Sequence, residues 1–163
     1  SHVIVGHSER RRLFGETNSE IRQKLAAALA SDLKPVLCIG ETLGERRAEQ
    51  TRRVLSRQLS GALKGTSKGV NESLTVAYEP GWAIGTGKNA HPAQVRDAHG
   101  WIRQGLTRRL GKAQAQNIPI LYGGSVNPQN APDIATIPEV DGVLVGGASL
   151  DPESFVAIVS AFR

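Results

Sequence analysis

The sequence has no methionine, one cysteine and few aromatic residues, with two Trp, two Tyr and three Phe in 163 positions. The single cysteine, Cys38, excludes an internal disulfide and is typical of a reducing compartment, so we expect a cytoplasmic protein. No apolar run approaches the roughly 20 residues that a membrane-spanning helix needs. The net charge of +5 is compatible with nucleic-acid binding, but the aromatics are too few for a base-stacking platform. We therefore expect neither a membrane nor a nucleic-acid partner.

The absence of methionine is informative about where the sequence begins. The chain begins inside a strand-like run, "HVIVG" at 2–6, whereas a translated chain normally starts with Met and a lead-in. We expect the sequence to be part of a longer protein.

Apolar runs of strand length recur along the chain, and apolar residues at helical spacing lie between them. The alternation predicts an α/β fold with a parallel sheet covered by helices, in one domain over residues 1–163. Pro92 is expected to open the third long helix, and Asp151 the last. The predicted strands span 2–6, 35–40, 74–79, 118–124 and 142–147.

Two details of the helices are also predicted. Asn18 or Ser19 is the expected cap of the helix that buries Ile21 and Leu25. The last helix is expected to bury Phe155, Val159 and Phe162, which lie at helical spacing.

Each predicted strand ends in a polar, glycine-rich turn, such as "GHSE" after the first and "EPG" after the third. The carboxyl ends of parallel strands meet at one edge of the sheet, where α/β proteins bind ligands. We therefore expect one site built from these turns.

Glu79 and His7 are the titratable candidates at this edge. Alternation along the strand places Glu79 on the face of Thr75 and Ala77, where it can act as a general base or form a surface salt bridge. His7 can be a catalyst or a hydrogen-bonded structural residue. A carboxylate and an imidazole, with no serine nucleophile or metal-ligand spacing, indicate proton transfer beside a carbonyl.

Glycine pairs at the ends of the last two strands favour a phosphate ligand. Gly146-Gly147 and Gly123-Gly124-Ser125 can form tight turns or present bare N–H groups to an anion. The loop 80–90 does not match a Walker loop, because Trp82 stands where the first glycine is required. Its match to the dinucleotide pattern lies too far beyond the strand.

Five motifs in order resemble the triosephosphate isomerase family: "VIVGHSERR", "CIGETLGERR", "AYEPGWAIGTGK", "LYGGSVNPQNA" and "DGVLVGGASLDPESF". The resemblance runs over the whole chain. It implies the last five strand–helix units of a (β/α)8 barrel, a fold that needs about 250 residues. It also implies interconversion of dihydroxyacetone phosphate and glyceraldehyde 3-phosphate, with no cofactor and no metal.

The resemblance also implies roles for individual residues. Glu79 matches the base, His7 matches the neutral imidazole that polarises the carbonyl, and Glu9 matches a buried acid beside them. The matches to the phosphate-binding donors are Gly85, Ser125, Gly146 and Gly147. Residues 80–90 match a lid that includes Pro80, Trp82, Ile84, Gly85, Thr86, Gly87 and Lys88, and that Tyr122 and Ser125 help to hold.

The sequence departs from the family in two respects. Gly81 stands where the family usually carries a bulkier residue such as Val, which predicts a looser hinge. Nothing corresponds to the asparagine and lysine on the family's first strand. Because five strands cannot close a barrel built for eight, we expect an open barrel, or one completed by self-association or by an N-terminal barrel segment.

Two other functions remain open from the residues alone: an inactive barrel fragment that associates, and another phosphate-binding barrel enzyme. Cys38 is expected to be a buried strand residue, and Glu41 to pair with Arg46 or Arg47. His2, His91 and His99 receive no role.

Overall fold

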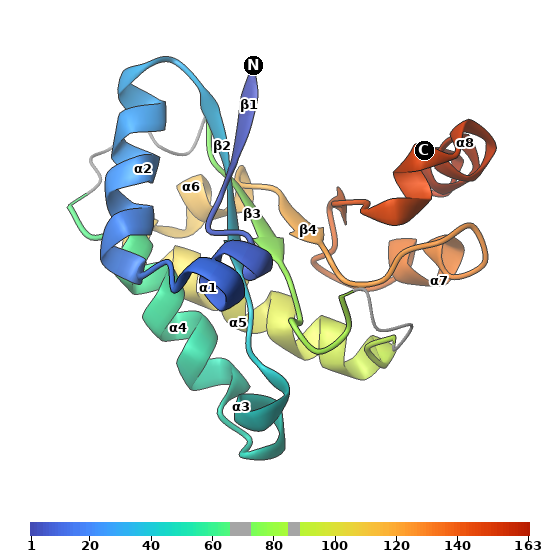
Figure 1. The fold of residues 1–163 in the computed structure, drawn as a ribbon, viewed down its shortest axis with the longest axis horizontal. Coiled ribbons are helices and arrows are strands. Elements are labelled where there is room, and N and C mark those ends of the chain that lie inside the picture. The colour runs from blue at the N-terminus through green and yellow to red at the C-terminus, as the bar shows by residue number, and fades with distance from the viewer. Residues whose placement is uncertain (66–72, 85–88) are drawn as a thin grey trace.

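The computed structural model describes residues 1–65, 73–84 and 89–163. Five strands form one parallel sheet in the order β1-β2-β3-β4-β5 (Figure 1). The strands are β1 (His2–Val5), β2 (Lys34–Ile39), β3 (Thr75–Tyr78), β4 (Ile120–Tyr122) and β5 (Gly142–Val143). The predicted α/β fold with five parallel strands is confirmed, although the last two strands are shorter than the apolar runs that predicted them.

The register brings the carboxyl ends of the strands to one edge. Tyr78 is paired with Ile39 on one side and with Tyr122 on the other. The backbone pairing continues past the strands, because the Glu79 N–H donates to the Ile39 carbonyl at 2.8 Å and the Gly123 N–H to the Tyr78 carbonyl at 2.8 Å. The turns after neighbouring strands are therefore held side by side.

Helices cover one face of the sheet, where the main core lies (Figure 1). The two faces of β3 differ as alternation predicts: Val76 and Tyr78 enter this core, whereas Ala77 joins Val36 and Cys38 in a small cluster on the other face. The helices are α1 (Ser8–Phe14), α2 (Asn18–Ala30), α3 (Leu43–Arg47), α4 (Thr51–Ala62), α5 (Pro92–Leu110), α6 (Lys112–Gln116), α7 (Ala131–Ala135) and α8 (Pro152–Ser160), with a 3-10 turn η2 (Gly147–Leu150).

The start of α2 differs from the prediction. Thr17, not Asn18 or Ser19, is the N-cap: its side chain accepts from the Glu20 N–H, and the Glu20 carboxylate accepts from the Thr17 N–H. Thr17 has the extended backbone that a cap requires, so it completes a capping box that the sequence also contains. The predicted starts at Pro92 and Asp151 are confirmed.

The buried face of α8 also differs from the prediction. Ile158 is fully buried, whereas Phe155 and Val159 are exposed at 41% and 38%. Phe162 is partly buried against the core. The helix lies beyond the two-residue strand β5 at the edge of the sheet, and one of its side chains, Ile158, is buried (Figure 1). Across the described ranges, no helix combines the length and apolar character that crossing a membrane would take.

Candidate active site

Glu79 and His7 meet at the carboxyl edge of the sheet. Glu79 directly follows β3 and His7 lies two residues after β1, and 3.0 Å separates Glu79 Oε1 from His7 Nε2. The second carboxylate oxygen, Oε2, accepts from the Ser8 N–H at 2.8 Å. Both oxygens of the carboxylate are therefore held by the turn after β1.

The other ring nitrogen of His7 determines where its proton lies. Nδ1 accepts from the Glu9 backbone N–H at 3.3 Å, which makes His7 the N-cap of α1. In a neutral imidazole the nitrogen that accepts carries no proton, so Nε2 bears it and donates to Glu79. The ring is thus oriented with an N–H directed toward the carboxylate.

Glu79 is almost fully buried, with 2% of its surface exposed. Burial raises the pKa of this carboxyl, and the contacts with His7 and with the Ser8 N–H oppose the rise. A raised pKa suits a carboxylate that must take up and release a proton near neutral pH. The glycine at 123 leaves room for it, because a Cβ there would lie 3.0 Å from Glu79 Cγ.

Two neighbours of Glu79 were not predicted as site residues. Ser8 acts through its backbone N–H, and its place directly after His7 in the turn "GHSE" is the signal that points to it. Cys38 is fully buried, as predicted, and its thiol is hydrogen-bonded to Glu79. Burial, followed by the nearby Glu79 charge, raises the pKa of the Cys38 thiol, so the thiol is a neutral donor.

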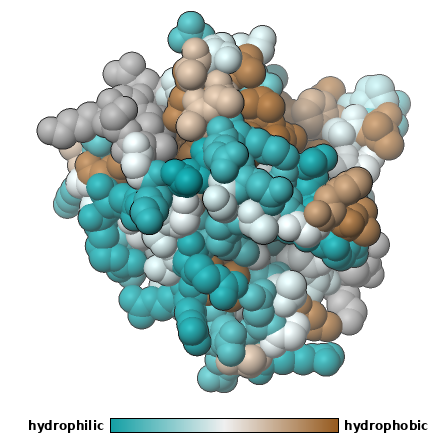
Figure 2. Space-filling model, turned by 60° about the vertical axis from the view of Figure 1, so that its left-hand side comes forward, coloured by the Kyte–Doolittle hydropathy of each residue, from teal (hydrophilic) through white to brown (hydrophobic). Residues whose placement is uncertain are grey.

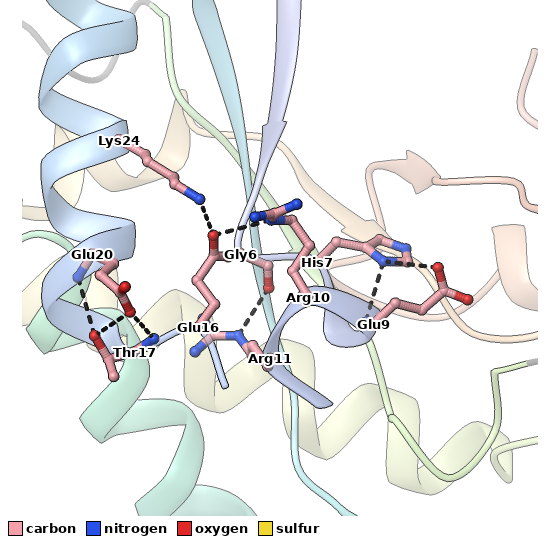
Figure 3. Close-up of polar contacts among 9 residues, drawn as sticks. All are labelled: Gly6, His7, Glu9, Arg10, Arg11, Glu16, Thr17, Glu20 and Lys24. Carbon is pink, nitrogen blue, oxygen red and sulfur yellow. Dashed lines mark hydrogen bonds and ion pairs between the residues drawn. The ribbon is translucent and has the colours of Figure 1, made fainter. Parts of the chain in front are cut away.

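Ion pairs and hydrogen bonds anchor the turn that carries His7 (Figure 3). Arg11 Nε donates to the Gly6 carbonyl at 2.8 Å, which ties α1 to the end of β1. Arg10 on α1 and Lys24 on α2 both contact Glu16 Oε1. These contacts attach the turn to the end of β1 and to α2. They therefore fix the position of the His7 ring relative to the sheet.

Glu9 does not have the expected burial. Its side chain is 60% exposed, and its Oε2 lies 4.0 Å from His7 Nδ1 (Figure 3). The expectation of a buried acid is wrong for the described chain, in which no residue of α1 is buried. Glu9 is close to the site through its backbone N–H.

The start of the predicted lid is attached to the turn after β2. Trp82 Nε1 donates to Glu41 Oε1 at 3.1 Å, and the Tyr78 hydroxyl donates to the same carboxylate at 3.1 Å. The Gly81 N–H donates to the Glu41 carbonyl at 3.0 Å. The predicted ion pair of Glu41 with Arg46 is present at 3.5 Å. Glu41 therefore contacts the residues that come before and after Glu79 in the chain, Tyr78 on one side and Gly81 and Trp82 on the other. Its motif alone did not indicate this role.

The described residues include only part of the predicted lid. Pro80 is buried, whereas Trp82 and Ile84 are half-buried. Residues 85–88, which include the predicted Gly85, Thr86, Gly87 and Lys88, lie outside the described residues.

Tyr122 is the last residue of β4 and lies next to Ala90, the C-terminal residue of the predicted lid. Its hydroxyl is hydrogen-bonded to the backbone of Ala90, and burial raises its pKa to about 12. A Cβ at Gly124 would lie 2.1 Å from the Tyr122 hydroxyl, so only glycine allows the ring to fold against this turn. Ser125 is half-buried in the same turn, and its carbonyl accepts from Asn130 Nδ2 at 3.1 Å.

Gly146 and Gly147 are exposed and open the 3-10 turn η2. A Cβ at either position would meet no atom within 4 Å, so the structure leaves open space around them. Strand order places this turn and Ser125 at the same edge as Glu79, but no hydrogen bond given by the described residues joins them to Glu79. The structure thus brings His7, Ser8 and Glu79 into contact and leaves the glycine turns separate.

The family model of triosephosphate isomerase matches residues 1–162. The chain is 51% identical to the triosephosphate isomerase of Alkalilimnicola ehrlichii over 162 residues, 99% of this chain and 64% of that protein. It is 49% identical to the triosephosphate isomerase of Thermus thermophilus over 158 residues, 97% of this chain and 63% of that protein. The chain therefore spans about 64% of the length of the relatives it matches. A match over nearly all of its residues, on a sheet whose turns bring His7 and Glu79 together, shows that the chain belongs to the triosephosphate isomerase family.

Proposed function

We propose that the protein interconverts dihydroxyacetone phosphate and glyceraldehyde 3-phosphate by proton transfer through an enediolate. The observation that carries the proposal is the 3.0 Å contact between His7 Nε2 and Glu79 Oε1. It joins an N–H donor to a buried carboxylate whose pKa is raised, which are the two groups that this proton transfer needs. Family membership supports the same reaction.

In this proposal, substrate replaces the contact between the two side chains. The carbonyl oxygen accepts the hydrogen bond from His7 Nε2, where negative charge develops as the enediolate forms. The freed Glu79 Oε1 takes the proton from the carbon beside the carbonyl and returns it to the neighbouring carbon. The resemblance to the family supplies these roles, and the orientation of the His7 ring supports them. Glu9 contributes through the backbone N–H that keeps Nδ1 of His7 occupied.

The triose phosphate is proposed to place its phosphate among Gly85, Ser125, Gly146 and Gly147. The open space around the last two supports a backbone cradle for an anion. Residues 80–90 are proposed to close over the substrate, with Tyr122 holding the closed segment through the backbone of Ala90. Closure would exclude water and strengthen the electrostatic interactions at the carbonyl.

We also propose that the chain is the C-terminal part of one barrel domain and is completed by a complementing N-terminal segment or by self-association. Two observations support this. Among the described strands, β1 and β5 each have a single neighbour, which leaves two sheet edges to cover. Large hydrophobic side chains also reach the surface, where Leu13, Phe14 and Leu150 are exposed at 63%, 72% and 87%. Figure 2 shows one face of the molecule, on which hydrophobic patches lie among hydrophilic residues. A cytoplasmic location fits the single buried cysteine.

The test is steady-state isomerisation of glyceraldehyde 3-phosphate, measured beside a Glu79→Gln variant purified identically. Glu79→Gln keeps the shape of the side chain and its place beside Ser8 but removes the base. We expect the rate to fall by about 10³-fold, the scale of general-base catalysis. The identical purification matters, because a trace of host enzyme near the diffusion limit would imitate weak activity. Equal rates in the two preparations would contradict the proposal and favour an inactive barrel fragment.

A further inference from the structure

A cavity of about 850 Å³ lies beside Glu79 and the first residues of the predicted lid. Its walls come from α1, from the start of α2, from the turn after β2 with α3, and from α4. Glu79, Gly81, Trp82 and Ile84 line it as well. None of Ser125, Gly146 and Gly147 lines it. Its volume is in the range of pockets that bind small organic molecules, about 300–1,000 Å³. The cavity is therefore distinct from the proposed phosphate site.

Arg11 brings a positive charge to this cavity, and the nearby charges of Glu16 and Glu79 act on it without direct contact. Its guanidinium donates to the Gly6 carbonyl at 2.8 Å, the Cys38 carbonyl at 3.0 Å and Asn18 Oδ1 at 2.9 Å, all of them neutral acceptors. Within the described part of the chain, no carboxylate forms an ion pair with it. Burial is strong enough to lower its pKa. A partly desolvated guanidinium with N–H groups to spare attracts an oxyanion.

Two further arginines line the cavity nearer to solvent. Arg12, in the last turn of α1, is exposed and has no ion pair with any described residue. Arg57 on α4 contacts Glu45 at 3.2 Å. Arg12 therefore adds a second available cation beside Arg11.

Most of the carboxylates that line the cavity already contact other groups, and none of them forms an ion pair with Arg11 or Arg12 among the described residues. Glu41 accepts from Tyr78 and Trp82 and pairs with Arg46. Glu16 pairs with Arg10 and Lys24. The remaining ones are Glu45, which caps α3 and pairs with Arg57, Glu79, which is held by His7 and Ser8, and Glu9, which is mostly exposed.

The lining of the cavity also includes apolar side chains. They belong to Ile39, Leu43, Trp82 and Ile84. A flat hydrophobic body can pack against these side chains while a charged group reaches the arginines. A ligand there would also contact Trp82, whose indole N–H is bound to Glu41, so it would share a wall with the first residues of the proposed lid.

We infer that this cavity binds a small aromatic carboxylate, with its oxyanion on Arg11 and Arg12 and its ring between Trp82 and Leu43. Any effect of the ligand on turnover rests on the proposed isomerase function, but binding itself does not.

The test is isothermal titration calorimetry with 2-naphthoate as the probe, in the presence of excess glycerol 3-phosphate, which resembles the triose phosphates and is present to occupy the phosphate site. We expect saturable one-to-one binding that glycerol 3-phosphate does not displace. Arg12→Gln should weaken it about tenfold, the loss of one charge-assisted contact. Arg53→Gln, which removes an exposed arginine of α4 that does not line the cavity, should bind as the parent does. The uncharged analogue 2-naphthalenemethanol should bind at least about tenfold more weakly.

A second variant separates this cavity from non-specific binding. Leu43→Glu places a negative charge among the apolar side chains of the lining from an exposed position in α3, so it should abolish binding while circular dichroism stays unchanged. The inference is overturned by an absence of saturable binding, by displacement with glycerol 3-phosphate, or by equal affinity in Arg12→Gln and Arg53→Gln. Because the readout is heat of binding, an inactive protein that binds 2-naphthoate would refute the isomerase proposal and leave this one standing.

Discussion

His99 is predicted to make the protein less stable below pH 6.5. This histidine of α5 is fully buried and packs edge-on against Tyr78, with ring centroids 5.8 Å apart. Its Nδ1 lies 2.8 Å from the Glu139 carbonyl, so Nδ1 carries the proton of the neutral ring and donates. Nε2 is buried and has no hydrogen-bond partner among the described residues. Protonation of Nε2 would therefore create a buried, charged N–H group that has no acceptor among the described residues.

The magnitude follows from the pKa of the buried ring. Burial lowers the pKa of His99 from 6.5 to about 4, although the hydrogen bond to the Glu139 carbonyl and the nearby Asp141 oppose the change. Above pH 6.5 both the folded and the unfolded chain hold this histidine neutral, so it contributes nothing. Between pH 6.5 and 4 the unfolded chain binds a proton that the folded chain does not, and stability falls as pH falls. Since each factor of ten in proton affinity is worth about 1.4 kcal/mol, the full loss is about 3 kcal/mol.

The assay is urea unfolding followed by circular dichroism at several pH values between 8 and 4.5, with the parent protein and a His99→Asn variant. Asparagine keeps an N–H that can donate to the Glu139 carbonyl but does not titrate. The two curves of unfolding free energy against pH should run parallel above pH 7 and converge as pH falls, because only the parent chain gains a proton at residue 99 when it unfolds. Curves that stay parallel down to pH 4.5 would refute the argument that burial holds this ring neutral.

Two predictions concern stability alone. Gly40→Ala should destabilise the fold by more than about 3 kcal/mol, because its Cβ would lie 1.6 Å from the Glu79 carbonyl oxygen. Gly44→Ala, where a Cβ meets no atom within 4 Å, should change the unfolding free energy by less than about 1 kcal/mol; similar urea midpoints for the two variants would contradict the packing at Glu79. Arg103→Gln should cost about 1–2 kcal/mol, because this arginine contacts Glu139 at 2.7 Å and Asp141 at 2.8 Å and donates to the Ile118 carbonyl at 2.7 Å, whereas both carboxylates are partly exposed and water can replace it. The exposed Arg108→Gln is its control and should shift the urea midpoint little; equal shifts would mean that the bridge contributes nothing.

Much of the fold was predictable because it depends on short-range periodicity. Alternation along 74–79 correctly separates Val76 and Tyr78, in the main core, from Ala77 on the other face. The strand ends were predicted to within a few residues, and Pro92 and Asp151 open helices as expected. These features follow from a local backbone geometry that the neighbouring residues determine.

The prediction was wrong where several local patterns compete or where packing decides. Thr17 and Asn18 are both good caps, and the Glu20 carboxylate, which closes the capping box, favours Thr17. For α8, helical spacing permits more than one apolar face, and the position of the helix beyond β5 buries Ile158 rather than Phe155. Glu9 was expected to be buried on the strength of a resemblance, but burial depends on what covers α1.

The sequence by itself determined the order of strands and helices, the face on which Glu79 lies and the family, because these depend on residue type and spacing along the chain. The tertiary structure decided which distant groups meet. Glu79 lies 71 residues from Ser8, yet its carboxylate accepts from the Ser8 N–H, and Trp82 donates to Glu41 across 41 residues. Parallel pairing places these turns side by side at one edge of the sheet. Burial there then raises the pKa of Glu79, an effect that no spacing along the chain specifies.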